Sequence, residues 1–313
     1  MNKILVIDQH AAIYRDRLRA EFPALQILAA SDNKELPQDL ADVEVLISFG
    51  MGLPEDFYRR AAGLKWFQCL ATGVDHVVRQ PDLNPATVVT SGRGIHGAPM
   101  RETVIYLMQG VSRNVARLIE DNKAHIWDRR FYNLLYGRTA VVVGVGVVGV
   151  AIGRLLQAFG MRVIGVTRTR RQIDGFDEML PVAQLHAAAA QADFLINVLP
   201  ATAENTRIFD SKIFAAMKPS AYYINAGRGQ TTDETALIGA LAERRIAGAG
   251  LDVFQTEPLP PESPLWELPN VFITPHLGGY TADYEDLIMP LIIDNLRLYL
   301  AGRQSEMQNI VAR

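Results

Sequence analysis

Short apolar runs alternate along the chain with segments whose apolar residues recur at helical spacing. In the first third, the apolar runs are Lys3–Asp8, Leu25–Ala29, Val43–Phe49, Lys65–Leu70 and Val88–Thr90. After a glycine-rich interruption and a long helical stretch they resume at Thr139–Val143, Met161–Val166, Asp193–Leu199, Ala221–Ala226, Ile246–Phe254 and Val271–Thr274. This alternation predicts an α/β protein in which parallel strands are buried between helices, arranged as two doubly wound sheets.

The interruption between the two series is Ser91–Pro99, a glycine-rich segment without periodicity. We place a hinge there and predict one helix over Met100–Ile126 after it. Arg93 and His96 are the chemically versatile groups of this segment, and either can bind substrate or simply be solvated. Trp127 closes the predicted helix, where it can anchor an interface or cover a core.

The stretch that follows, Gly137–Arg171, contains a strand, a glycine turn, a helix and a second strand. Gly144, Gly146 and Gly149 fit G-x-G-x-x-G, which in this context is typical of dinucleotide binding. The first glycine allows the tight turn, the second lets backbone approach a pyrophosphate, and the third lets the helix pack on the strand. The helix N-terminus then faces the phosphates. The alternative is a purely structural turn.

The residues after the second strand indicate which dinucleotide binds. An NAD-type site offers an acidic residue about 20 positions past the first glycine. Here the chain reads Thr167, Arg168, Thr169, Arg170, Arg171. A guanidinium can pair with a 2′-phosphate and the hydroxyls can add hydrogen bonds. We therefore predict NADP(H) in preference to NAD(H), with Arg168 as the main contact and the later arginines as candidates for a solvated turn.

Composition narrows the class of protein. The 313 residues are 49% hydrophobic, enough for two cores, and the formal net charge of −3 argues against a nucleic-acid partner. Cys69, the single cysteine, lies in an apolar run and is expected in the core. The N-terminus reads as a strand rather than a signal peptide, and no apolar run reaches the length of a membrane span. We expect a cytoplasmic protein.

Three ionisable residues follow successive predicted strands: Arg228, Glu257 and His276. The carboxyl ends of parallel strands form the ligand crevice of a doubly wound sheet, so the three can converge beside a nicotinamide. Reduction of a 2-oxo acid needs a proton donor, a group that orients it and a cation for the carboxylate. His276 can donate the proton, Glu257 can orient the imidazole and Arg228 can clamp the carboxylate. Separately, each could be a surface or structural residue.

At these residues the chain resembles the D-2-hydroxyacid dehydrogenase family. The motifs that carry the resemblance are the glycine turn Gly144–Gly149, Ile224–Gly229, Leu251–Phe254 leading to Glu257–Pro258, and Thr274–His276. The run EPLPPESPLW from Glu257 to Trp266 is most similar to the glyoxylate and hydroxypyruvate reductase branch. The resemblance covers essentially the whole chain and implies reduction of a small 2-oxo acid to a D-2-hydroxy acid, with His276 as general acid.

The resemblance also implies a Rossmann cofactor domain inserted into a flavodoxin-like substrate domain, and a homodimer paired through the helix after the hinge. We expect residues 1–93 and 283–313 to bind substrate and residues 94–282 to bind NADP(H). The expected substrate contacts are Met51, Thr72, Gly73, Arg228 and Tyr280, with backbone donors at Thr72 and Gly73. The expected cofactor contacts are Gly144, Gly146, Val147, Val148, Gly149, Thr167, Arg168, Thr169, Leu199, Pro200, Thr206, Ala226, Gly227, Asp252, Gly278 and Gly279. No metal site is expected.

Two segments depart from the common family pattern: the usual acid after the second cofactor strand is replaced by Thr167-Arg168, and the hinge reads SGRGIHGAPMRE. The second departure leaves the pocket shape open. Two other functions remain as alternatives. Some proteins of this fold are dinucleotide-sensing corepressors without turnover, and a dehydrogenase of formate or phosphite type, or for another class of D-2-hydroxy acid, would use the same sheet edge.

Overall fold

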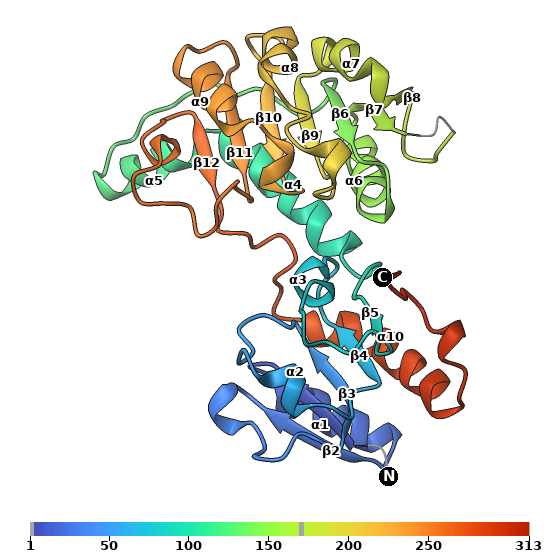
Figure 1. Cartoon of the computed structure of the whole chain (residues 1–313). Coiled ribbons are helices and arrows are strands. Elements are labelled where there is room, and N and C mark those ends of the chain that lie inside the picture. Colours follow the sequence, from blue (N-terminus) through green and yellow to red (C-terminus); the bar gives the residue numbers. More distant parts are fainter. Residues whose placement is uncertain (1–2, 169–171, 313) are drawn as a thin grey trace. The chain divides into compact units, whose positions relative to one another are not determined.

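The computed structural model describes residues 3–168 and 172–312 and divides into two compact units. The first unit comprises the chain up to Ile95 together with the part from Ala282 onward, and the second is His96–Thr281. In Figure 1 the first unit contains the blue strands and the red helix α10, and the second runs from green to orange. The second unit is therefore an insertion within the first.

The first unit is built on a five-stranded parallel sheet in the order β2-β1-β3-β4-β5. Its strands are β1 (Lys3–Ile7), β2 (Gln26–Ala30), β3 (Val43–Ser48), β4 (Trp66–Cys69) and β5 (Val88–Thr90). This is the flavodoxin-like strand order. The strands are short, continuous apolar runs because both faces of the sheet are covered by helices.

Helices α1 (Ala11–Glu21) and α10 (Tyr284–Leu300) cover one face of this sheet. Their apolar residues pack with Ile4 and Val6 of β1. The other face carries α2 (Phe57–Arg60) and α3 (Asp75–Val78), which pack with Leu5 between those two residues. Alternate residues of one strand thus feed two separate cores, as a doubly covered sheet requires. Cys69 is buried in the second of these cores, as predicted.

The second unit holds a seven-stranded parallel sheet in the order β12-β11-β10-β9-β6-β7-β8. Its strands are β6 (Thr139–Val143), β7 (Arg162–Thr167), β8 (Glu178–Pro181), β9 (Phe194–Asn197), β10 (Tyr222–Asn225), β11 (Gly248–Leu251) and β12 (Val271–Ile273). The order reverses between β6 and β9, and this switch point is where ligands bind in doubly wound sheets.

Helices cover both faces of the second sheet. On one face lie α4 (Gly97–Ser112) and α6 (Val147–Ala158), packed with Ala140 and Val142 of β6. On the other lie α7 (Leu185–Gln191), α8 (Ser211–Ala216) and α9 (Glu234–Ala242), packed with Val141 and Val143. The two doubly wound parallel sheets predicted from the sequence are confirmed.

The structure corrects several predicted elements. The single helix expected over Met100–Ile126 is two helices, α4 and α5 (Val115–Lys123). Asn114 separates them: its φ of 50° is left-handed, and its side chain accepts a hydrogen bond from the Arg117 amide as the cap of α5. Asparagine tolerates this conformation better than most residues. Strand β8 was not predicted. No helix in the described part of the chain is long and apolar enough to cross a membrane.

Candidate active site

The residues proposed for catalysis follow three neighbouring strands of the second sheet. Arg228 lies just beyond β10, Glu257 lies in the loop that follows β11, and His276 lies just beyond β12. Strand β11 pairs in parallel with both of the others, so the three loops leave the sheet at one edge. The strands are labelled side by side in Figure 1.

Glu257 and His276 are in direct contact. The imidazole Nδ1 lies 2.6 Å from Oε2 of Glu257, and both side chains are partly exposed. The other carboxylate oxygen, Oε1, accepts a hydrogen bond of 2.9 Å from the backbone N–H of Phe254. With Nδ1 donating to a carboxylate, the tautomer and orientation of the ring are set, and Nε2 is left for a substrate.

Glu257 is held as a carboxylate. Burial alone would raise its pKa, but the hydrogen bonds to His276 and Phe254 and the charges of His276 and Arg228 outweigh burial and lower the pKa. The group therefore remains ionised as the pH falls toward the ordinary range of glutamate, about 4.3. The influence of the Arg228 charge also indicates that the guanidinium lies in the neighbourhood of the pair.

The backbone at His276 is unusual. Its φ is 54°, a left-handed conformation that costs a non-glycine residue on the order of 1–2 kcal/mol. The neighbouring strand stabilises it, because the His276 amide donates to the carbonyl oxygen of Asp252 at 2.8 Å. Backbone strain of this kind is typical of functional sites.

Asp252 braces the same turn with its side chain, which is buried. Oδ1 accepts from the Thr274 hydroxyl at 2.5 Å and from the Leu277 amide at 2.8 Å, and Oδ2 accepts from the Gly278 amide at 2.9 Å. These three donors lie on both sides of His276. Asp252, expected from the resemblance as a cofactor contact, thus also holds the loop of His276 in place.

Arg228 is half-buried at the start of a short 3-10 turn, η4 (Gly229–Thr231). Its Nη1 donates to the Gly227 carbonyl at 2.7 Å. The loop packs closely on the neighbouring one, since a Cβ at Gly229 would lie 1.9 Å from the backbone of Phe254. The loop of Arg228 and the loop of Glu257 therefore meet through their main chains.

The glycine turn after β6 is suited to a dinucleotide. Gly144 adopts φ 106°, and a Cβ at Gly149 would lie 2.2 Å from the Gly144 carbonyl oxygen. By contrast, a Cβ built on Gly146, the N-cap of α6, would meet no described atom within 4 Å beyond its own chain neighbours. Val147 is exposed and Val148 is half-buried at the start of that helix. Open space before the N-terminus of a twelve-residue helix fits a pyrophosphate.

The residues expected at the adenosine 2′-position follow β7. Thr167 ends the strand and Arg168, which is exposed, comes directly after it. Thr169, also predicted as a contact, lies outside the described residues. The Glu204 carboxylate is near Arg168: a hydrogen bond from its own backbone amide and the charge of Arg168 both lower its pKa.

The other expected cofactor residues lie in turns after β9, β10 and β12. A Cβ at Gly227 would lie 2.7 Å from the Leu199 carbonyl oxygen, so the turns after β9 and β10 are in contact. Pro200 and Thr206 are exposed in the first of these turns. The remaining expected residues, in the turns after β10 and β12, are Ala226, Gly278 and Gly279, of which the first two are buried.

The model of the family described as "D-isomer specific 2-hydroxyacid dehydrogenase, NAD binding domain" matches residues 105–278. The chain belongs to this family. Glyoxylate/hydroxypyruvate reductase B of Pectobacterium atrosepticum is 32% identical over 274 residues, which cover 85% of each protein. The protein is therefore an NAD(P)-dependent oxidoreductase that acts on the CH–OH group.

Solved structures agree over nearly the full length. A D-isomer specific 2-hydroxyacid dehydrogenase family protein from Aeromonas salmonicida superposes with a TM-score of 0.91 at 32% identity, covering 99% of both chains. An NADPH-dependent glyoxylate/hydroxypyruvate reductase from Sinorhizobium meliloti, solved with NADP and sulfate, has a TM-score of 0.82 at 28% identity and covers 99% of this chain and 98% of that one. The two-unit architecture of this dehydrogenase is thus shared with enzymes of the family.

The expected substrate contacts of this dehydrogenase are divided between the units. Met51, Thr72 and Gly73 lie in loops of the first unit, and Met51 is exposed. Arg228 and Tyr280 lie in the second, where Tyr280 is exposed.

The two hinge residues whose roles the sequence left open also fall in different units. Arg93 is exposed in the first unit, where its Nε donates to Asn309 Oδ1 at 3.4 Å. His96 begins the second unit and lies beside Gly279.

Sequence reasoning missed a buried polar network behind these loops. Asn197 and Asn225, the last residues of β9 and β10, contact one another at 2.9 Å and also bond to the turns that follow them. A signal was available, because an amide at the end of an otherwise apolar strand needs partners when it is buried. The partners themselves become evident only in the folded chain.

Proposed function

We propose that this protein reduces small 2-oxo acids of the glyoxylate and hydroxypyruvate type to D-2-hydroxy acids, with NADPH as reductant. The observation that carries the proposal is the 2.6 Å contact between His276 Nδ1 and Glu257, on the same sheet edge as Arg228. This arrangement combines a proton donor, its orienting carboxylate and a cation. Proteins named glyoxylate/hydroxypyruvate reductase are among the relatives of the chain, which supports the substrate class.

His276 acts as general acid in this proposal. When bound, the nicotinamide supplies a hydride to the carbonyl carbon of the 2-oxo acid. His276 donates the Nε2 proton to the carbonyl oxygen, which would otherwise become an alkoxide, while Glu257 accepts from Nδ1 and stabilises the protonated ring. The proton on Nε2 is recovered from solvent after product leaves. A neutral imidazole whose Nδ1 donates to Glu257 has no proton on Nε2, so it could neither donate to the carbonyl oxygen nor complete the reduction.

Arg228 binds the substrate carboxylate and polarises the carbonyl, since a guanidinium offers two parallel donors to these oxygens. We further propose that Thr72 and Gly73 add backbone donors and that Met51 and Tyr280 shape the pocket. In this assignment residues 1–93 and 283–313 form the substrate-binding domain, and residues 94–282 form the NADP(H)-binding domain.

Cofactor binding is assigned to the turn residues described above, and the preference for NADPH over NADH to the turn after β7. Arg168 is exposed directly after the strand, where an NAD-type site would carry an acid. The 2′-phosphate of NADPH carries negative charge that a guanidinium binds strongly, whereas the ribose of NADH has only uncharged hydroxyls at this position. The NADPH dependence of the Sinorhizobium meliloti relative supports this assignment.

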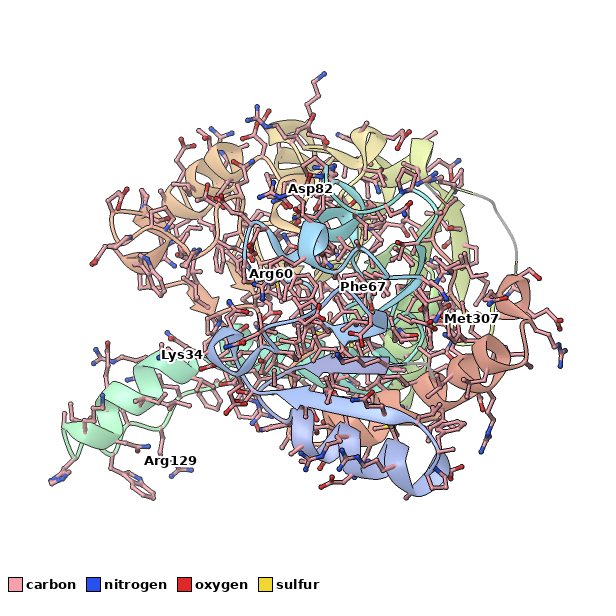
Figure 2. The ribbon with its side chains drawn as sticks, turned by 60° about the horizontal axis from the view of Figure 1, so that its bottom comes forward. Lys34, Arg60, Phe67, Asp82, Arg129 and Met307 are labelled. Atoms are coloured by element: carbon pink, nitrogen blue, oxygen red, sulfur yellow. The ribbon has the colours of Figure 1, made fainter. Side chains whose placement is uncertain are left out.

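The protein is also proposed to be a homodimer. Apolar side chains that a single chain leaves exposed gather on α4, on α5 and on the segment after it: Tyr106, Leu118, Ile119, Ile126, Trp127, Phe131, Tyr132, Leu134 and Tyr136. Trp127 is 92% exposed. Figure 2 shows Arg129 on this segment beside α5. Exposed apolar residues gathered in this way mark an interaction surface, and a second copy of the chain is the expected occupant.

The test is steady-state kinetics with NADPH and a panel of 2-oxo acids that includes glyoxylate, hydroxypyruvate, pyruvate and phenylpyruvate. We expect kcat/KM to be highest for the two small substrates, with oxidation followed at the NADPH absorbance band. Tight NADPH binding without turnover of any member would instead favour a dinucleotide-sensing protein.

A further inference from the structure

A buried network of amide and hydroxyl groups lies behind the Arg228 loop. Its members come from β9, β10, η4 and the residue that follows η4, and are Asn197, Tyr223, Asn225, Thr231 and Thr232, all at most 3% exposed. The reaction assigned above uses none of them. Buried polar groups are costly unless fully paired, so a satisfied network at this position calls for an explanation.

The direction of the hydrogen bonds follows from backbone groups, because an amide N–H can only donate and a carbonyl oxygen can only accept. The Leu199 amide donates to Asn197 Oδ1 at 3.0 Å, so the Asn197 nitrogen must face the network. That nitrogen donates to Thr231 Oγ1 at 2.7 Å and to Asn225 Oδ1 at 2.9 Å. The Gly227 amide also donates to Asn225 Oδ1, at 3.1 Å, which sets the orientation of the second amide.

Thr231 is where the network reaches Arg228. Its hydroxyl is fully buried and lies 2.6 Å from the carbonyl oxygen of Arg228, which can only accept. The single hydroxyl proton must therefore point to Arg228, while the oxygen accepts from Asn197. The Thr231 backbone amide donates to the same carbonyl at 3.2 Å. One residue thus holds the Arg228 main chain through two bonds.

We propose that Thr231 is the positioning residue for Arg228: its buried hydroxyl, oriented by Asn197, holds the Arg228 main chain so that the guanidinium meets the substrate carboxylate. The inference rests on the proposed function of Arg228. It adds a residue that touches neither substrate nor cofactor but acts through one that does. Misplacement of a binding group by about 1 Å can cost roughly 10²-fold in rate, so such a support matters.

Thr231→Val tests this with little change of shape, because valine replaces the hydroxyl with a methyl group. Thr232→Val is the matched control: its hydroxyl is equally part of the network, 2.7 Å from the Tyr223 hydroxyl and 3.2 Å from Asn225 Nδ2, but it does not contact Arg228. Both variants should lose a similar amount of thermal stability. Thr231→Ser keeps the hydroxyl and should restore wild-type kinetics.

The kinetic readout is kcat/KM for glyoxylate at saturating NADPH. We expect Thr231→Val to lower it about 10- to 100-fold, mainly through KM, with the NADPH Kd nearly unchanged and Thr232→Val close to wild type. In an Arg228→Ala background, Thr231→Val should cost nothing further, because the group that it positions is absent. An equal loss in both backgrounds would show that Thr231 is merely structural. If Thr231→Val does not fold, Thr231→Ala takes its place in the same cycle.

A second readout does not depend on turnover. Backbone amide exchange of residues 227–230 in the NADPH-bound protein should be faster in Thr231→Val than in Thr232→Val or wild type. Equal exchange in the two variants would overturn the positioning role even if the enzyme is active. Conversely, wild-type protein that reduces no 2-oxo acid would overturn the proposed function, and the exchange data would still decide whether Thr231 holds the loop.

Discussion

Two regions of the second unit, the carboxyl edge of the sheet and the segment after α5, differ in whether their side chains have partners within the chain. At the carboxyl edge of the sheet, Asp252, Glu257 and His276 are joined to protein partners by short hydrogen bonds. The segment after α5 is held in place by a similar device: Arg130 donates to the buried carboxylate of Asp121 at 2.7 Å. Yet the aromatic side chains of that segment, led by Trp127 and Phe131, are exposed.

We interpret the first region as a site whose groups are positioned within one chain, and the second as a surface that a partner covers. At the sheet edge, the groups proposed as proton donor and orienting carboxylate are already in contact, as preorganised catalysis requires. The segment after α5 has an ion-paired anchor, but its side chains Trp127 and Phe131 are exposed, which argues for a partner. Substitutions in the first region should therefore change chemistry without changing assembly, and substitutions in the second should do the reverse.

His276→Ala should have the largest effect. General acid catalysis typically contributes about 10²–10⁴-fold, so kcat for glyoxylate should fall by that factor. The Kd for NADPH, measured by fluorescence titration, should stay near wild type because the imidazole is not part of the glycine turn. His186→Ala, an exposed histidine on α7, is the control. A variant with wild-type kcat would remove His276 from the mechanism.

Trp127→Ser combined with Phe131→Ser should have the next largest effect, which is to weaken dimerisation. Aromatic anchors of an interface are worth about 2 kcal/mol or more each and both subunits lose them, so the dimer Kd should rise by at least roughly 10³-fold. Analytical ultracentrifugation across a dilution series measures it. Ile13→Ser, an exposed residue of α1 in the first unit, controls for general loss of surface apolar area. A wild-type protein that remains monomeric at all concentrations contradicts the assignment.

Arg168→Ala should reduce the preference for NADPH. A charge-assisted hydrogen bond to the 2′-phosphate is worth about 1.5–3 kcal/mol, or on the order of 10- to 100-fold in Kd. Adding Thr167→Asp should move the preference toward NADH, since the carboxylate repels the phosphate and accepts from ribose hydroxyls. Arg154→Ala, an exposed arginine of α6 paired with Asp174, is the matched control. The assignment fails if the ratio of the two cofactors' kcat/KM values is the same with and without Arg168.

Glu257→Gln should have the smallest effect, a shift in pH profile. The lowered pKa of Glu257 means that its carboxylate is present above its ordinary range and is lost only as pH falls through the lowered value. The wild-type carboxylate therefore supports the protonated imidazole throughout the neutral range. A neutral amide cannot, so the activity optimum should move toward acid. Glu262→Gln, an exposed acid in the same loop, should leave the profile unchanged.

Much of this arrangement could be predicted because polar residues directly follow apolar runs. Parallel strands bring their carboxyl ends to one edge, so Arg228, Glu257 and His276 could be assigned to one region without coordinates. The sequence suggested that Glu257 and His276 interact, and the structure adds the 2.6 Å distance between them. Likewise, the glycine spacing predicted the turn after β6 and a helix N-terminus able to face phosphates, which is α6.

The remaining features depend on tertiary contacts. The break at Asn114 interrupts a continuous helical pattern without a proline, and β8 is a short edge strand of mixed polarity that ends in Pro181. The left-handed backbone at His276 depends on the neighbouring strand, and the Thr231 bond to Arg228 depends on an asparagine more than 30 residues away. Local patterns carry no record of such partners.

The central claim is that this sheet edge reduces a 2-oxo acid. It is tested most directly by incubating the protein with hydroxypyruvate and NADPH deuterated at the transferring position of nicotinamide C4, and analysing the product by chiral chromatography and mass spectrometry. The account predicts D-glycerate with one deuterium at C2, formed by wild-type protein and far more slowly by His276→Ala. Unlabelled product, L-glycerate, or no oxidation of NADPH would contradict it.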